Sequence, residues 1–153
     1  CQIINFLCRD NLPQAMASAS ILPFLLDLAN THCKHEELFG CILETLGYLA
    51  TLPHIQKELV KGHGLEELFR MIEENGDNMV VLDLGITFLS HCSRDKDATL
   101  WMKHNNVIGF LQGIMNSLPR RSPTRILAQE LLHHLQTSRV FLGMFPRQRK
   151  VLS

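Results

Sequence analysis

The sequence predicts an all-α protein made of repeated helical units, and three observations lead to that prediction. The 153 residues are 46% hydrophobic and 20% charged, a composition typical of a folded domain and not of a disordered chain. Apolar residues recur with helical spacing along nearly the whole chain. When the sequence is shifted against itself by 43 residues, its apolar positions superimpose twice without a gap. A constant offset of this kind indicates a repeat array.

The repeat is carried by apolar residues that recur at the same positions of three successive units. The aligned apolar sets are Leu22, Leu65 and Ile108; Leu25, Leu68 and Leu111; Leu28, Met71 and Ile114; Leu46, Leu89 and Leu132; and Leu49, Cys92 and Leu135. One more aligned position holds Ile42, Gly85 and Ala128.

Each unit contains three predicted helices. Pro13 and Pro53 suit the first turn of the short first helices, and Asp97 is predicted to cap the third of these. The connections to the second helices, residues 62–64 and 105–106, contain glycine, histidine and asparagine, which tolerate a positive φ. The predicted ranges are 13–19, 54–61 and 97–104 for the first helices; 21–30, 65–74 and 107–116 for the second; and 36–50, 79–92 and 124–136 for the third.

Three segments resemble the armadillo repeat family. Residues 54–60 (HIQKELV) and 64–68 (GLEEL) are similar to its first-to-second-helix signature, and residues 41–50 (CILETLGYLA) are similar to its third helix. Residues 3–9 (IINFLCR) fit the end of a preceding third helix. The resemblance covers nearly the whole chain. It implies a right-handed armadillo-like α-solenoid of about three three-helix repeats, with partial repeats at both ends.

The 43-residue register divides the chain into five parts. Residues 1–10 are predicted to end a preceding repeat, so the chain is interpreted as a fragment of a longer protein. Residues 11–52, 53–95 and 96–138 are predicted to form armadillo repeats 1, 2 and 3, and residues 139–153 a C-terminal cap and basic tail. Phe141 and Phe145 match the apolar register and are predicted to fold back as the cap, because a solenoid end otherwise exposes an apolar face. A short linear ligand for another protein is the alternative.

The resemblance also implies where a partner binds, because armadillo third helices line a concave groove. Only Asn5 keeps the asparagine typical of the family and no groove position keeps its tryptophan, so recognition of a nuclear-localisation peptide in the importin-alpha manner is not expected. The predicted groove residues are Asn5, Glu44, Tyr48, Thr87, His91, Glu130 and His134. Their carboxylates, aromatic ring and imidazoles suit a polar or basic peptide, or a partner helix. The alternative is that these residues form a merely solvated face.

Two of these residues, His91 and His134, raise the hypothesis of a pH switch. A free imidazole titrates near pH 6.5, so binding of a basic peptide would weaken on acidification. The alternative is a pair of exposed polar residues with no such role.

The net charge of zero hides an uneven distribution. Residues 1–115 carry 8 basic and 14 acidic side chains, whereas residues 116–153 carry 7 basic side chains and one acid, Glu130. The predicted basic patch, Arg120, Arg121 and Arg125, has no interleaved aromatic residues, so we expect an acidic protein partner and not nucleic acid. Ser122 in the same loop precedes a proline and is a weak candidate for phosphorylation.

No motif in the chain indicates catalysis. There is no phosphate-binding loop, no H-E-x-x-H and no G-x-S-x-G, and the His32, Cys33 and His35 loop lacks the fourth ligand of a zinc site. We therefore expect no enzyme activity, no cofactor, no metal and no small-molecule substrate. No apolar run is long enough for a membrane span. Five cysteines without a C-x-x-C pair indicate a reducing compartment, the cytoplasm, with the nucleus as an alternative.

The predicted function is a non-enzymatic scaffold or adaptor that binds a peptide or helix of a protein partner in the groove. Two alternatives remain open. In the first alternative, the chain is an assembly module whose exposed solenoid ends mediate self-association or docking. In the second, it is a regulatory domain of an enzyme that lies elsewhere in a longer chain.

Overall fold

The computed structural model of the chain describes residues 21–138. Within that range every regular element is an α-helix, as the sequence predicts. The predictions for Asn5, Phe141, Phe145, the helix at 13–19 and the parts 1–10 and 139–153 lie outside the described residues. The helices are α3 (Ile21–His32), α4 (Glu36–Leu49), α5 (Pro53–Lys61), α6 (Gly64–Glu74), α7 (Met79–Cys92), α8 (Lys96–His104), α9 (Val107–Ser117) and α10 (Pro123–Thr137).

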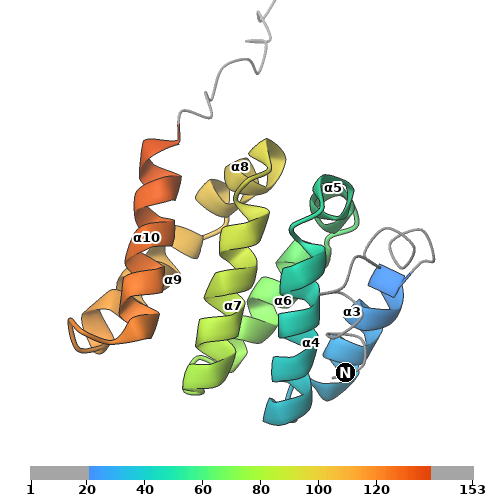
Figure 1. Ribbon diagram of the computed structural model, residues 1–153, viewed down its shortest axis with the longest axis horizontal. Coiled ribbons are helices and arrows are strands. Elements are labelled where there is room, and N and C mark those ends of the chain that lie inside the picture. The colour runs from blue at the N-terminus through green and yellow to red at the C-terminus, as the bar shows by residue number, and fades with distance from the viewer. Residues whose placement is uncertain (1–20, 139–153) are drawn as a thin grey trace, which may run out of the picture.

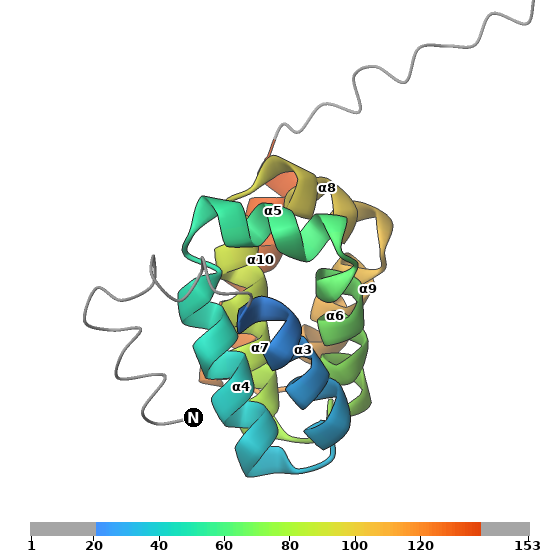
Figure 2. The ribbon, with the colours of Figure 1, turned by 90° about the vertical axis from the view of Figure 1, so that its right-hand side faces the viewer.

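Equivalent helices of successive units pack next to one another. The third helices α4, α7 and α10 stand side by side in one row, with α4 against α7 and α7 against α10 (Figure 1). The short helices α5 and α8 contact each other across one end of that row. The second helices α3, α6 and α9 lie on the opposite side from α4, α7 and α10 (Figure 2). The row of third helices is therefore one face of the described part of the chain.

The core lies between these helices and includes most of the apolar residues that the 43-residue register aligns. Leu25, Leu68 and Leu111 are buried, and they come from the second helices of three successive units. Leu46 and Leu89, from the third helices, are buried as well. Because each helix buries one apolar side and repeats its partner contacts after 43 residues, the repetition in the sequence follows from the packing.

The helix starts follow local chemistry. Pro53 and Pro123 stand in the first turns of α5 and α10, where a missing N–H costs no hydrogen bond. Helix α8 is capped by Asp95, whose carboxylate accepts hydrogen bonds from the N–H groups of Asp97 and Ala98 at 2.9 and 3.0 Å. The prediction that Asp97 is the cap was wrong, because Asp97 already lies in the first turn of the helix.

The tight connections between first and second helices each contain one residue with a left-handed backbone. These residues, His63 (φ 60°) and Asn106 (φ 56°), are 43 positions apart. In the first connection, histidine and not a neighbouring glycine takes the positive φ. Gly64 gives close packing instead, since a Cβ there would lie 2.9 Å from Leu26 Cδ1 and that side chain would have to move. The glycine therefore allows α6 to approach α3.

A polar contact repeats where each third helix turns into the next first helix. Gln56 Nε2 donates to the carbonyl of Ala50 at 2.6 Å, and 43 residues later Thr99 Oγ1 donates to the carbonyl of Ser93 at 2.7 Å. The buried Gln56 amide also donates to the carbonyl of His91 at 3.0 Å, in the next unit. This contact ties the end of α7 to α5 and fixes the backbone of His91.

Candidate functional site

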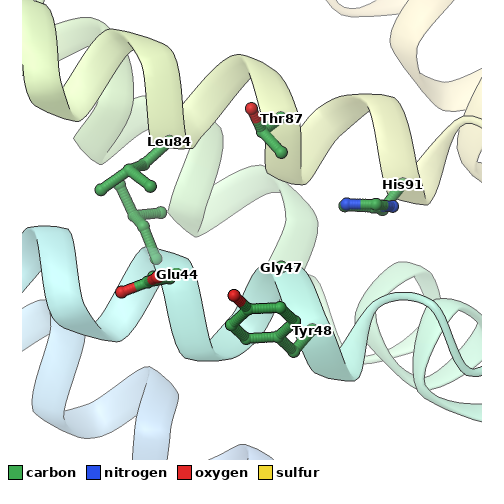
Figure 3. Close-up of a pocket in the computed structure, with 7 residues that line it drawn as sticks. Glu44, Gly47, Tyr48, Leu84, Thr87 and His91 are labelled. Atoms are coloured by element: carbon green, nitrogen blue, oxygen red, sulfur yellow. The ribbon is translucent and has the colours of Figure 1, made fainter. Parts of the chain in front are cut away.

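A pocket lies on the face of the third helices, between α4 and α7. Its volume is about 160 Å³. Four of the predicted groove residues line it, two from each helix, and Figure 3 shows their side chains around a common space. Three further residues, which the sequence analysis did not assign to the groove, complete the lining. The seven lining residues are Leu43, Glu44, Gly47, Tyr48, Leu84, Thr87 and His91.

Gly47 opens this pocket from within α4. The residue is buried, yet a Cβ added to it would meet no atom within 4 Å. By contrast, a Cβ at Gly40, seven residues earlier in α4, would contact Leu84 Cδ1 at 3.5 Å. A glycine inside a helix costs roughly 0.5–1 kcal/mol relative to alanine. At Gly47 neither a positive φ nor a close neighbour requires that cost, and the space left free is the pocket.

His91 supplies the imidazole at one end of the pocket. Its Nδ1 is buried and has no hydrogen-bond partner within the described residues. Burial of the ring, with a smaller effect of the nearby Arg94 guanidinium, lowers the pKa of His91. The imidazole is therefore neutral at pH 7. Gln56 holds the backbone carbonyl of His91, which fixes the point from which the ring projects.

The rest of the polar lining contributes a carboxylate and a phenol from α4 and a hydroxyl from α7. Glu44 and Tyr48 are one turn apart on α4, and both are half-buried. Thr87 Oγ1 donates to the carbonyl of Asp83 in its own helix at 2.8 Å, so it offers only its lone pairs to a ligand. The pocket thus combines an apolar floor with a few polar groups at its rim, as small binding pockets do.

The remaining predicted groove residues do not join this pocket. Glu130 and His134 are exposed on α10. His134 Nε2 lies 3.1 Å from the carbonyl of Ser93, a hydrogen-bond distance across the seam between α7 and α10. In the same seam Thr124 donates a hydrogen bond to the carboxylate of Asp83. The two seams of the row therefore differ, since one holds a pocket and the other is joined by side-chain hydrogen bonds.

The predicted basic patch lies at the loop between α9 and α10. Arg120 and Arg121 are exposed. Arg125 is half-buried, and its Nη1 donates to the carbonyl of Leu118 at 2.7 Å, which closes the loop. Only two of the three predicted guanidinium groups therefore stand free of the loop's own hydrogen bonds.

Other side chains that could bind a metal or act as a nucleophile are either far apart or unreactive. Among residues 21–138, no group of three or more His, Cys, Asp or Glu side chains lies close enough to hold a metal ion. Burial raises the pKa of the Cys92 thiol well above its usual range, so this cysteine is not a thiolate at neutral pH. The lining of the pocket contains no cysteine or serine nucleophile.

Sequence reasoning missed the floor of the pocket, Leu43, Gly47 and Leu84. A signal for one of them is present, because Gly47 lies inside an otherwise helical apolar pattern, where glycine costs about 1 kcal/mol relative to alanine. The two leucines carry no such signal, since an apolar residue at helical spacing is usually core.

Comparison with known proteins returned no relative: no family model, curated protein or solved structure matches the chain. Within residues 21–138, no single helix is both long and apolar enough to cross a bilayer. Only the bent pair of α4 and α5, at 120° to each other, reaches that threshold together, by length and composition alone.

Proposed function

We propose that this chain is a right-handed armadillo-like solenoid whose third helices bind a segment of a protein partner, and that it acts as a scaffold or adaptor without catalytic activity. The partner segment is an extended peptide or a helix. It lies across α4, α7 and α10 on the face that these helices share.

The observation that carries this proposal is the pocket between α4 and α7. The 43-residue register and the armadillo resemblance assign Glu44, Tyr48, Thr87 and His91 to a binding groove without reference to any coordinates. The same four side chains surround one pocket. A merely solvated helix face would not require a buried glycine in the last turn of α4 with open space beside its Cα.

The row of α4, α7 and α10 supports the same proposal by its spacing. Packed helices lie about 8–10 Å apart, and an extended peptide rises about 3.3 Å per residue. Successive helices would then meet every third residue of a bound segment. Glu130 and His134 on α10 remain exposed and would contact the part of the segment beyond the pocket.

A second candidate function is assembly through the end of the repeat array. A shallow cavity of about 330 Å³ lies between α9 and α10, lined by Gln112, Met115, Asn116 and Leu132. This site belongs to the last described unit, so it favours docking of another domain or copy at that end. The oligomeric mass would then depend on protein concentration, whereas groove binding leaves a monomer.

The test of the groove proposal compares proteins captured by three forms of the chain. The groove variant replaces Glu44, Tyr48, His91 and Glu130 by alanine. The matched control replaces four exposed residues of the second helices, Asp27, Glu66, Glu67 and Glu73, by alanine. Proteins that bind the wild type and the control but not the groove variant are the expected result. Partners that bind the groove variant with unchanged affinity would overturn the proposal.

A further inference from the structure

The size of the pocket between α4 and α7 fits one aromatic ring. Its volume is about 160 Å³. An apolar cavity of about 150 Å³ in another protein accommodates benzene. Free space lies beside Gly47, which lines the pocket, so a larger side chain there would take up part of that space. A six-membered ring is therefore an occupant of the right volume.

The lining favours an aromatic ring over a flexible polar chain. Leu43 and Leu84 contribute apolar surface from the two helices, and the ring of Tyr48 forms part of the wall. An aromatic guest against Tyr48 can adopt the offset or edge-to-face geometry that aromatic pairs prefer. Phe69 already makes such edge contacts elsewhere in the protein, with Trp101 and Phe110 at ring-centroid distances of 6.0 and 5.4 Å.

His91 defines the polar requirement of the occupant. His91 lines the pocket and its Nδ1 is buried, so we take Nε2 as the ring nitrogen that contacts the occupant. The neutral imidazole presents either a donor or an acceptor at Nε2, depending on its tautomer. A hydroxyl can both donate and accept, so it satisfies either form. An ammonium or guanidinium can only donate, so it satisfies only the tautomer that presents an acceptor at Nε2.

We propose that the pocket between α4 and α7 binds a tyrosine side chain of the partner, with the ring above Gly47 and the hydroxyl hydrogen-bonded to His91. This inference rests on the groove proposal, and it adds the residue type that the groove selects. Tyrosine is enriched at the energetic centres of protein interfaces because it buries a large ring and keeps one polar group.

The test uses two small probes, p-cresol, which is the tyrosine side chain, and toluene, which lacks only its hydroxyl. Each probe is titrated into the wild-type chain and followed by amide chemical shifts. Both should shift amides of α4 and α7, and p-cresol should bind about fivefold more tightly, the effect of one neutral hydrogen bond. In His91→Phe this preference should disappear. Gly47→Leu should abolish binding of both probes.

The matched control is Gly113→Leu. Gly113 also has no atom within 4 Å of an added Cβ, but it is exposed on α9, away from the pocket. Binding of both probes should be unchanged in this variant, and circular dichroism should show that both leucine variants are folded. Equal affinity for p-cresol and toluene in the wild type would overturn the tyrosine assignment. Binding that survives Gly47→Leu would do the same.

A random 12-residue peptide display library separates the two proposals. Selection on the wild type with counter-selection on Gly47→Leu should enrich peptides with tyrosine at one fixed position. Peptides that depend on Gly47 but lack tyrosine would overturn the tyrosine assignment and leave the groove proposal standing. If p-cresol binds but no peptide depends on the groove residues, the groove proposal fails, and a partner's tyrosine is excluded as the occupant.

Discussion

The row of third helices has two seams, one between α4 and α7 and one between α7 and α10. Both are formed by equivalent positions of the 43-residue repeat, but their side-chain contacts differ. Between α4 and α7, Gly47 leaves room for a pocket of about 160 Å³. Between α7 and α10, Thr124 donates to the carboxylate of Asp83, and His134 reaches the carbonyl of Ser93. The aligned counterpart of Gly47 in α7 is Ser90, which is exposed.

This difference separates positions that hold the array together from positions that are free to bind. Thr124 is buried, and its counterpart one unit earlier is Val81, so the hydroxyl is specific to the second seam. A side chain at Gly47 is not needed for any helix-to-helix contact, because nothing lies within 4 Å of an added Cβ. We therefore expect mutations in the second seam to change the stability of the protein, and mutations in the first seam to change its binding of a partner.

The largest expected effect on stability is that of Thr124→Val, which removes the hydrogen bond of the second seam. The half-buried Asp83 carboxylate loses its donor from α10, and hydrogen bonds to charged groups contribute about 1.5–3 kcal/mol. The free energy of unfolding, measured by urea denaturation, should fall by about that amount.

The control is Thr87→Val in the first seam, where the hydroxyl bonds only within its own helix. A change of less than about 0.5 kcal/mol is expected there. Equal losses in both variants would contradict the distinction between the seams.

A smaller effect, of opposite sign, is expected for Gly47→Ala. Alanine is the better helix former and its Cβ meets open space, so the free energy of unfolding should rise by about 0.5–1 kcal/mol. The exposed Gly113→Ala on α9 should give a similar gain in the same urea experiment. The two variants should differ in binding, since only alanine at position 47 reduces the pocket. A loss of stability at position 47 would show that the pocket is not open space.

The smallest expected effect concerns the pH dependence of stability through His91. Burial and Arg94 lower the pKa of this imidazole in the folded state below the 6.5 of a free histidine. The unfolded chain therefore binds this proton more readily, and the free energy of unfolding falls as the pH drops through 6.5 toward the lowered pKa. Thermal unfolding at pH 7.5 and 5.5 should show a smaller acid-induced loss in His91→Gln than in the wild type. The same loss in both would contradict a neutral imidazole in the folded protein.

Most of the helical layout could be predicted from the sequence, because helix ends depend on local chemistry. The range 79–92 matches α7, and proline starts α5 and α10 where the first turn tolerates it. Two details could not be predicted, because neighbouring residues can fill the same role. Asp95 competes successfully with Asp97 for the cap, and His63, flanked by two glycines, takes the left-handed conformation.

The candidate site could be predicted only in part, for a physical reason. The register indicates which side of a third helix a residue faces, so it brings Glu44, Tyr48, Thr87 and His91 together. Whether the space between two helices is filled depends on side chains from both, which periodicity does not describe. Gly47 and Gly85 both lie in third helices, yet a Cβ at Gly85 would lie 2.8 Å from Ile72 Cγ2. One glycine seats α7 on α6, and the other opens the pocket.

The most direct test of the central claim, that the third helices bind the partner, is site-specific photo-crosslinking. A photoreactive phenylalanine analogue is placed at Ser90, the exposed counterpart of Gly47 on α7, and in a second form at Glu67, exposed on α6. A bound partner should crosslink to position 90 and not to position 67. Crosslinking at position 67 alone would contradict the claim, because the partner would then lie on the second helices.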